Sequence, residues 1–196
     1  MMAIDTTNMC SHLKKKLFEE DGEYHRLWMA IQALVIEVND KKGQEFTSDI
    51  RTYYESLNIK GLFVDTEVEI RPNKPLSSSE NLGDIDVLLI NNETKQIVCI
   101  EAKYYTESRT TYELIQQNRK IVTKDLSHVI DRNKWCKENK DKFKFYVPEV
   151  DGTYNVSTIF LTYHENAYNY FDHQNDFGLR FLSAMDIVEN PMIVFE

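Results

Sequence analysis

Two short apolar segments joined by a polar turn constrain this chain more than any other feature of its sequence. The segments are residues 87–90 and 97–100, and the polar residues 91–95 lie between them. Side chains alternate between the two faces of a β-strand, so a run that is apolar at every position indicates a strand buried on both faces. A short polar turn pairs such strands antiparallel. The sequence therefore predicts a hairpin in the interior of a sheet.

Charged residues stand at one end of this hairpin. Asp84 and Asp86 precede the first apolar run, and Glu101 and Lys103 follow the second. Residues two positions apart share one face of a strand, and antiparallel pairing brings the two charged faces together. Buried carboxylates repel each other unless a cation lies between them, and oxygen ligands favour Mg²⁺ or Mn²⁺ over zinc. The pattern indicates a metal-dependent nuclease site, in which Lys103 would stabilise charge on a phosphate or position the attacking water.

A simpler interpretation stays open for these four charged residues. They could form the solvated face of an amphipathic hairpin, with Lys103 in an ion pair that has no catalytic role. The two apolar runs argue against this, because acids at the ends of strands buried on both faces need an explanation.

The segment Gly83-Asp84-Ile85-Asp86, followed by Glu101-Ala102-Lys103, resembles the signature of the PD-(D/E)xK, or restriction-endonuclease-like, superfamily. The order helix, strand, hairpin, helix, strand over roughly residues 44–165 is similar as well. The resemblance implies that Asp86, Glu101 and the backbone carbonyl of Ala102 bind the metal and that Lys103 is catalytic. Ile85 replaces the proline of the signature, a common variation that leaves the aspartate ligand in place.

Many members of this superfamily add a third acid from the helix before the first strand. Glu45 is the nearest glutamate at the start of that helix, and Asp49 and Glu37 are alternatives. An acid near the N-terminus of a helix is also favoured by the helix dipole alone, so Glu45 has a structural explanation beside its possible role as a metal ligand.

Hydrophobic periodicity predicts an α/β fold with a central mixed sheet, which contains the hairpin, and helices packed on it. We expect strands at 62–70 and 157–163, a long helix from about 111 to 139, and a short strand–helix element at 181–188. Upstream we expect helices at 11–20, 24–40 and about 44–57, with a break at Gly43. Residues 1–42 would form an N-terminal helical appendage and residues 43–196 the nuclease-like domain.

The appendage carries an apolar stripe at helical spacing. A patch of this size is rarely left in water, so it must pack on its own domain or pair with another chain. We favour pairing, because Trp and large apolar side chains dominate association energies. The stripe consists of Leu27, Trp28, Ile31, Leu34, Val35 and Val38.

The net charge of −9 argues against a self-sufficient DNA-binding protein. Residues 95–144 nevertheless hold twelve lysines and arginines against seven acids, a net charge of +5, which leaves −14 for the rest of the chain. Arg109, Arg119, Lys120 and Lys124 fall in this segment and are candidates for phosphate contacts, although a solvated helix face explains any one of them more simply. We therefore expect a homo-oligomer or a partner protein to complete DNA binding.

Other classes of protein fit less well. No apolar run approaches the ~20 residues of a membrane span, the N-terminus lacks a signal-peptide pattern, and three scattered cysteines indicate a reducing compartment. We expect a cytoplasmic protein that does not bind membranes. The sequence predicts a Mg²⁺- or Mn²⁺-dependent DNA endonuclease of a prokaryotic or phage restriction, defence or DNA-processing system. Two alternatives stay open: a structure-selective resolvase or RNase on the same fold, and a non-catalytic subunit that binds a partner protein.

Overall fold

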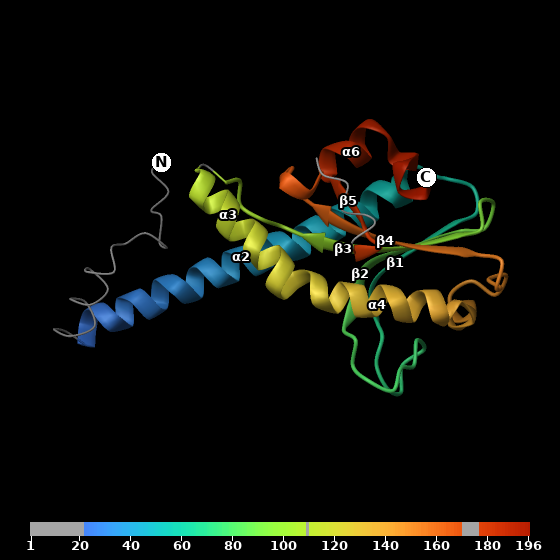
Figure 1. Ribbon diagram of the computed structural model, residues 1–196, viewed down its shortest axis with the longest axis horizontal. Coiled ribbons are helices and arrows are strands. Elements are labelled where there is room, and N and C mark those ends of the chain that lie inside the picture. The colour runs from blue at the N-terminus through green and yellow to red at the C-terminus, as the bar shows by residue number, and fades with distance from the viewer. Residues whose placement is uncertain (1–21, 109, 170–176) are drawn as a thin grey trace. The chain divides into compact units, whose positions relative to one another are not determined.

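The computed structural model describes residues 22–108, 110–169 and 177–196, and in the first part of helix α2 it describes the side chains of residues 29, 33, 34 and 37 onward. The helix expected at 11–20 lies outside the described residues. The chain divides into two compact units, Met1–Lys42 and Gly43–Glu196. In chain order the elements (Figure 1) are α2 (Gly22–Ser56), β1 (Leu62–Glu69), β2 (Asp84–Asn91), β3 (Gln96–Lys103), α3 (Thr111–Lys120), the π-helical turn η1 (Ile121–Asp125), α4 (Leu126–Glu138), the 3-10 turn η2 (Lys140–Phe145), β4 (Asn155–Thr162), the 3-10 turn η3 (Ala167–Asn169), β5 (Arg180–Ser183), α6 (Ala184–Glu189) and the 3-10 turn η4 (Pro191–Phe195).

The five strands form one mixed sheet in the order β1-β2-β3-β4-β5. β1, β2 and β3 pair antiparallel, whereas β4 runs parallel to both β3 and β5. The register of the hairpin places Ile90 opposite Ile97 and Val87 opposite Ile100. The predicted α/β fold, with a mixed sheet that contains an antiparallel hairpin and is flanked by helices, is confirmed at this level.

Alternation along the hairpin sends apolar side chains into two cores, one on each face of the sheet. On one face, Val87, Leu89, Val98 and Ile100 pack with residues of α2 and α6, including Phe46, Ile50, Tyr54 and Ile187. On the other face, Leu88, Ile90, Ile97 and Cys99 pack with Cys136 of α4 and Phe143 of η2. Figure 1 shows α4 and α6 on opposite sides of the sheet. The hairpin is therefore central and buried on both faces, as its composition predicts.

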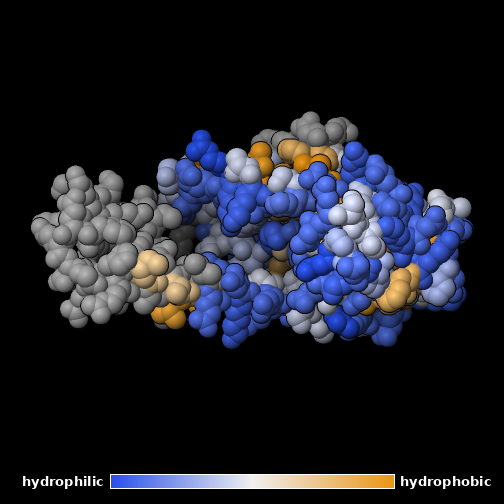
Figure 2. All heavy atoms as spheres, turned by 90° about the horizontal axis from the view of Figure 1, so that it is seen from below, coloured by the Kyte–Doolittle hydropathy of each residue, from blue (hydrophilic) through white to orange (hydrophobic). Residues whose placement is uncertain are grey.

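The helical stretch expected from about 111 to 139 is present, but it contains a π-helical turn. The amide of Leu126 donates to the carbonyl of Ile121, five residues earlier, as a π-helix requires. Both side chains are buried in the core cluster that contains Phe160 of β4. In a regular α-helix, side chains five residues apart point to different sides of the helix. The wider π-helical turn lets the side chains of Ile121 and Leu126 both face the sheet. The outer face of α4 is polar, and hydrophilic residues predominate on the side of the molecule seen in Figure 2.

The expected helix break at Gly43 is wrong, since α2 runs through it without interruption. Glycine in a helix interior costs only about 1 kcal/mol relative to alanine. Gly43 does not adopt a left-handed conformation, and the hydroxyl of Thr47 donates to its carbonyl. Its flanking residues, Lys42 and Gln44, are good helix formers, so nothing in the local sequence forces the helix to end.

Two members of the apolar stripe of α2 have described side chains, and both are exposed. Leu34 is 59% and Val38 51% exposed, as is nearby Met29 at 55%. The side chains of Leu27, Trp28, Ile31 and Val35 lie outside the described residues. The described part of the stripe is therefore apolar and exposed.

Candidate active site

The candidate site lies where β2 and β3 separate. Their regular pairing ends at Val87 and Ile100. Beyond that point the side chain of Asp86 replaces the missing backbone partner, and its Oδ2 accepts a hydrogen bond of 2.7 Å from the amide of Ala102. The N–H and C=O of a strand residue point to the same side, so the Ala102 carbonyl also faces the opening between the strands.

The neighbouring strand β1 is irregular at the same level. Its register passes from Thr66 opposite Val87 to Val68 opposite Ile85, which leaves Glu67 and Asp86 without regular pairing. Glu67 has a φ of 54°, in the left-handed region that side chains disfavour. Asn58, Asn73 and Lys95 also have a positive φ but lie in turns, whereas Glu67 adopts it inside a strand, and strained backbone in such a place often accompanies a functional site.

Glu101 and Lys103 share one face of β3, and both meet Asp86. Lys103 Nζ lies 2.6 Å from Glu101 Oε1 and 3.9 Å from Asp86 Oδ2. The side chain of Glu101 is 10% exposed, that of Asp86 21% and that of Lys103 32%. The structure therefore brings the three predicted residues together at an opening that solvent reaches mainly from the side of Lys103.

A fourth charged residue, Arg132 of α4, completes this cluster. One of its terminal nitrogens donates to Glu101 Oε2 and the other to the backbone carbonyl of Asp84. Sequence reasoning missed Arg132, although one signal was available. It lies three residues after Val129 and four before Cys136, both buried, so helical spacing places Arg132 on the inner face of α4.

The electrostatics of the cluster follow from its burial. Burial and the neighbouring carboxylate of Glu101 raise the pKa of Asp86 to about 7, and together they outweigh the opposite effects of Lys103, the Ala102 amide and Arg132. Burial lowers the pKa of the Lys103 ammonium, but the attraction of Glu101 and Asp86 prevails and the pKa is raised overall. Lys103 is therefore a cation at neutral pH, whereas the carboxyl of Asp86 is only partly ionised near neutrality.

Helix α3 and the π-helical turn bring further groups toward this face. The hydroxyl of Tyr105 donates to Asp125 Oδ2 at 2.6 Å. Burial and this bond raise the pKa of Tyr105, so it stays a neutral donor. Lys120 Nζ lies 5.3 Å from the centre of the Tyr105 ring, a cation–π distance. These contacts attach the basic α3–η1 segment to the loop that follows β3, the strand of Glu101 and Lys103.

The other predicted site residues are placed differently. Glu45, Asp49 and Glu37 are exposed on α2. Around Glu45 this helix packs on the sheet face that carries Val87 and Ile100, whereas Asp86 and Glu101 belong to the other face. Arg109 lies outside the described residues, while Arg119, Lys120 and Lys124 are exposed on α3 and η1. Among the residues that the structure describes, no group of three or more His, Cys, Asp or Glu side chains is arranged to hold a metal ion.

The donor set at the opening nevertheless suits Mg²⁺ or Mn²⁺. It consists of two carboxylates and the carbonyl of Ala102, all of them oxygen ligands of the kind that these ions prefer. The raised pKa of Asp86 reflects its burial and, after that, repulsion by Glu101, and a bound cation would offset both. Glu101 contacts Lys103 and Arg132, yet each carboxylate oxygen has two lone pairs and can accept a second partner.

Comparisons with known proteins give no relatives: no family model, no curated protein and no solved structure matches this chain. No helix in the described part of the chain combines the length and the apolar character needed to cross a membrane.

Proposed function

We propose that this chain is a metal-dependent nuclease of the PD-(D/E)xK type that hydrolyses phosphodiester bonds in DNA. The observation that carries the proposal is the convergence of Asp86, Glu101 and Lys103 at the opening between β2 and β3. The order of elements supports it too, since a helix and a strand precede the hairpin and β4 then pairs parallel with β3. The restriction-endonuclease-like fold is part of this proposal.

Each residue of the site has a defined task in this proposal. Asp86, Glu101 and the Ala102 carbonyl would hold Mg²⁺ or Mn²⁺, which when bound supplies an activated water and stabilises charge on the phosphate. Lys103, a cation in a partly dry site, would stabilise charge that develops on the phosphate oxygens. Arg132 positions the carboxylate of Glu101 through its buried ion pair.

Nucleic-acid binding is assigned to the basic segment beside the site. Arg119, Lys120 and Lys124 are exposed on α3 and η1, where they could contact a phosphate backbone. The rest of the chain carries −14, so we expect weak intrinsic affinity and a requirement for a second copy or a partner protein. A cytoplasmic restriction, defence or DNA-processing complex of a prokaryote or phage is the setting that the resemblance favours.

The pairing of Glu101 favours one other candidate function. Its two oxygens contact Lys103 and Arg132, an arrangement that balances its charge without a metal ion. A non-catalytic subunit that keeps this cluster as a structural ion-pair network, and binds a partner through other surfaces, would show the same contacts.

The two candidates differ in activity and in metal binding. The purified chain should be incubated with plasmid, linear and single-stranded DNA and with RNA, each with Mg²⁺, Mn²⁺ or EDTA. A nuclease cleaves at least one substrate with a divalent ion and none with EDTA, and the substrate that is cut distinguishes a DNase from an RNase or resolvase. A non-catalytic subunit cleaves none, and its melting temperature does not respond to either ion.

A further inference from the structure

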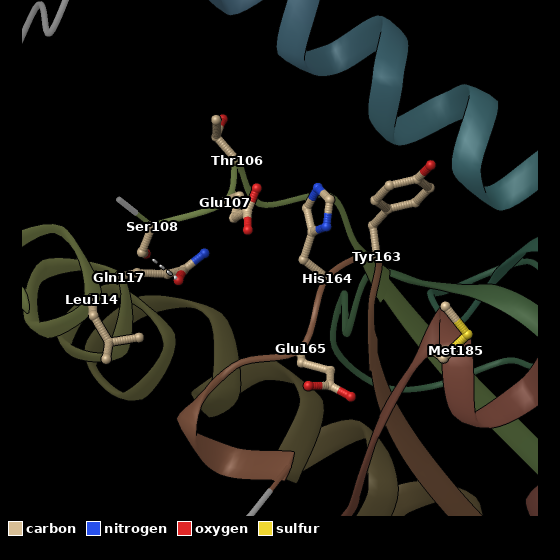
Figure 3. Close-up of a pocket in the computed structure, with 9 residues that line it drawn as sticks. All are labelled: Thr106, Glu107, Ser108, Leu114, Gln117, Tyr163, His164, Glu165 and Met185. Carbon is tan, nitrogen blue, oxygen red and sulfur yellow. Dashed lines mark hydrogen bonds between the residues drawn. The ribbon is translucent and has the colours of Figure 1, made fainter. Parts of the chain in front are cut away.

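A pocket of about 400 Å³ opens between the segments that follow β3 and β4 (Figure 3). One wall comes from the loop after β3 and from α3, with Glu107, Ser108 and Gln117. Another wall comes from the segment after β4, with Tyr163, His164 and Glu165. The site described above uses none of these residues.

The strand register fixes the position of the pocket relative to Lys103. Lys103 pairs with Thr162, and the amide of Tyr163 donates to the Lys103 carbonyl at 3.2 Å. The pocket therefore lies at the carboxyl ends of the parallel strands β3 and β4, where the ring of Tyr163 packs on Phe46, on the sheet face opposite Asp86 and Glu101. In open α/β sheets, crevices at this edge are where ligands bind.

The aromatic residues at the pocket are arranged to present ring surface. The rings of Tyr163 and His164 lie 4.8 Å apart and nearly perpendicular, at 87°. Tyr104 and Phe46 also pack against Tyr163, with ring centres 5.0 and 5.3 Å from its own. Tyr163 is still 43% exposed. An exposed aromatic ring held by its neighbours is a platform on which a planar group can stack.

The polar lining favours a ligand that donates hydrogen bonds. Glu107 and Glu165 contribute carboxylates, and the Gln117 side chain, held by a 2.9 Å hydrogen bond from the hydroxyl of Ser108, contributes an amide. Among the lining residues that the structure describes, none is a lysine or arginine. Such a lining disfavours a phosphate and suits a neutral group with N–H donors.

We propose that this pocket binds an unpaired nucleobase with an exocyclic amine, which belongs to a strand that crosses the edge of the sheet from the phosphate at Lys103. The base stacks on Tyr163 and donates from its amine to the carboxylates of the pocket. The placement of a phosphate of the same strand at Lys103 rests on the proposed nuclease function. Binding of the base to the pocket can be measured without it. Because a paired base must first be unpaired and unstacked, which costs free energy, the pocket favours substrates with single-stranded or splayed nucleotides.

Binding should be measured by fluorescence anisotropy in EDTA, where no cleavage occurs. The probes are labelled single strands of deoxyadenylate, deoxycytidylate and thymidylate, and a duplex of the first with the last. We expect the adenine and cytosine strands to bind more tightly than the thymine strand and the duplex. Tyr163→Ala should weaken their binding about tenfold, and Tyr163→Phe should restore it, since stacking does not need the hydroxyl.

Two further variants keep the test decisive. Tyr163 also contacts Phe46, so its truncation could loosen the core, whereas Glu165→Gln leaves the packing intact. This variant should reduce the preference for adenine and cytosine over thymine, because an amide can also donate to the thymine carbonyls. Phe145→Ala removes an aromatic side chain that is 67% exposed outside the pocket and should bind like the wild type.

Equal binding of all strands and the duplex, unchanged by Tyr163→Ala and Glu165→Gln, would overturn the base pocket. A parallel measurement uses a labelled oligoarginine peptide. If the peptide binds in a Glu165-dependent manner and the DNA strands do not, the pocket accepts a cationic side chain and the proposal is also wrong. The nuclease proposal is judged separately, by cleavage with Mg²⁺ or Mn²⁺: cleavage without base selectivity rejects the pocket alone, and base selectivity without cleavage rejects the nuclease alone.

Discussion

Arg132 and Glu101 lie 31 residues apart in sequence and form a buried ion pair between α4 and β3. The same guanidinium donates to the backbone carbonyl of Asp84 at the start of β2. One side chain thus connects a helix with both strands of the hairpin at the point where they separate. It also fixes the carboxylate that Lys103 contacts from the other side.

Loss of Arg132 should destabilise the fold. Arg132→Met leaves a carboxylate oxygen of Glu101 buried without its partner. Removing one member of a buried ion pair lowers the free energy of unfolding by about 3–5 kcal/mol. The double variant Arg132→Met, Glu101→Gln should recover part of this loss, because it removes the uncompensated charge. Urea unfolding measures both. Lys60→Met, which breaks the exposed pair with Glu93, is the control and should change little; an Arg132→Met variant as stable as this control would show that the pair contributes nothing.

The pKa of Asp86 predicts a pH-dependent stability in the metal-free protein. The folded-state pKa of about 7 lies above the ordinary value of 3.8, so unfolding favours ionisation of this carboxyl. Stability should therefore fall as pH rises from about 4 to about 7 and then stay level, with a total penalty on the order of 4 kcal/mol.

Asp86→Asn keeps the acceptor for the Ala102 amide and removes the titration. Urea unfolding in EDTA should give nearly equal stabilities for this variant and the wild type near pH 4, with the variant clearly more stable at pH 8. Parallel stability curves across this range would mean that Asp86 ionises in the folded protein as freely as in the unfolded chain.

Continuity of α2 through Gly43 can be tested by one substitution. Apart from its chain neighbours and the backbone of its own helix, a Cβ at this position would meet nothing within 4 Å, and the backbone there is helical. Gly43→Ala should therefore stabilise the helix by about 0.5–1 kcal/mol and raise helicity measured by circular dichroism. A variant with lower helicity would indicate that the chain needs glycine at this point, as an interrupted helix would.

The apolar stripe of α2 should take part in association with another chain. Leu34 and Val38 are its members with described, exposed side chains. Replacing both by Lys should lower the molecular mass measured by light scattering without lowering the melting temperature, because neither side chain is part of a buried core. The same replacement at Met185 and Val188, exposed on α6, is a control at another apolar surface. An unfolded Leu34, Val38 double variant would mean instead that the stripe belongs to a core.

The hairpin and its charged end could be predicted from sequence because their signals are local. Two-sided burial of 87–90 and 97–100 follows from an unbroken apolar run, and the meeting of Asp86, Glu101 and Lys103 follows from alternation across a short turn. The strand boundaries agree with the structure to within a few residues for the same reason.

The features that sequence reasoning missed depend on distant contacts or on small energies. Arg132 resembles any other cation of a basic helix until α4 is packed against the sheet, where its partners are Glu101 and a strand carbonyl. Gly43 indicated a helix end, but its cost is too small to end a helix between good helix formers. Glu45 was chosen by its distance along the chain, whereas the face on which α2 packs is set by Phe46 and Ile50.

The rate of DNA cleavage tests the central claim most directly. It should be measured for the site variants Lys103→Met and Glu101→Gln and for the control variants Lys60→Met and Glu93→Gln. Each site variant makes the same substitution as its control, which is placed in the exposed pair of Lys60 and Glu93. We predict that, with Mn²⁺ present, each site variant cleaves at least ~10²-fold more slowly than the wild type, while both controls keep its rate. Lys103→Met should still bind Mn²⁺ by calorimetry. Cleavage at the wild-type rate by both site variants would contradict the assignment of this cluster as a nuclease site.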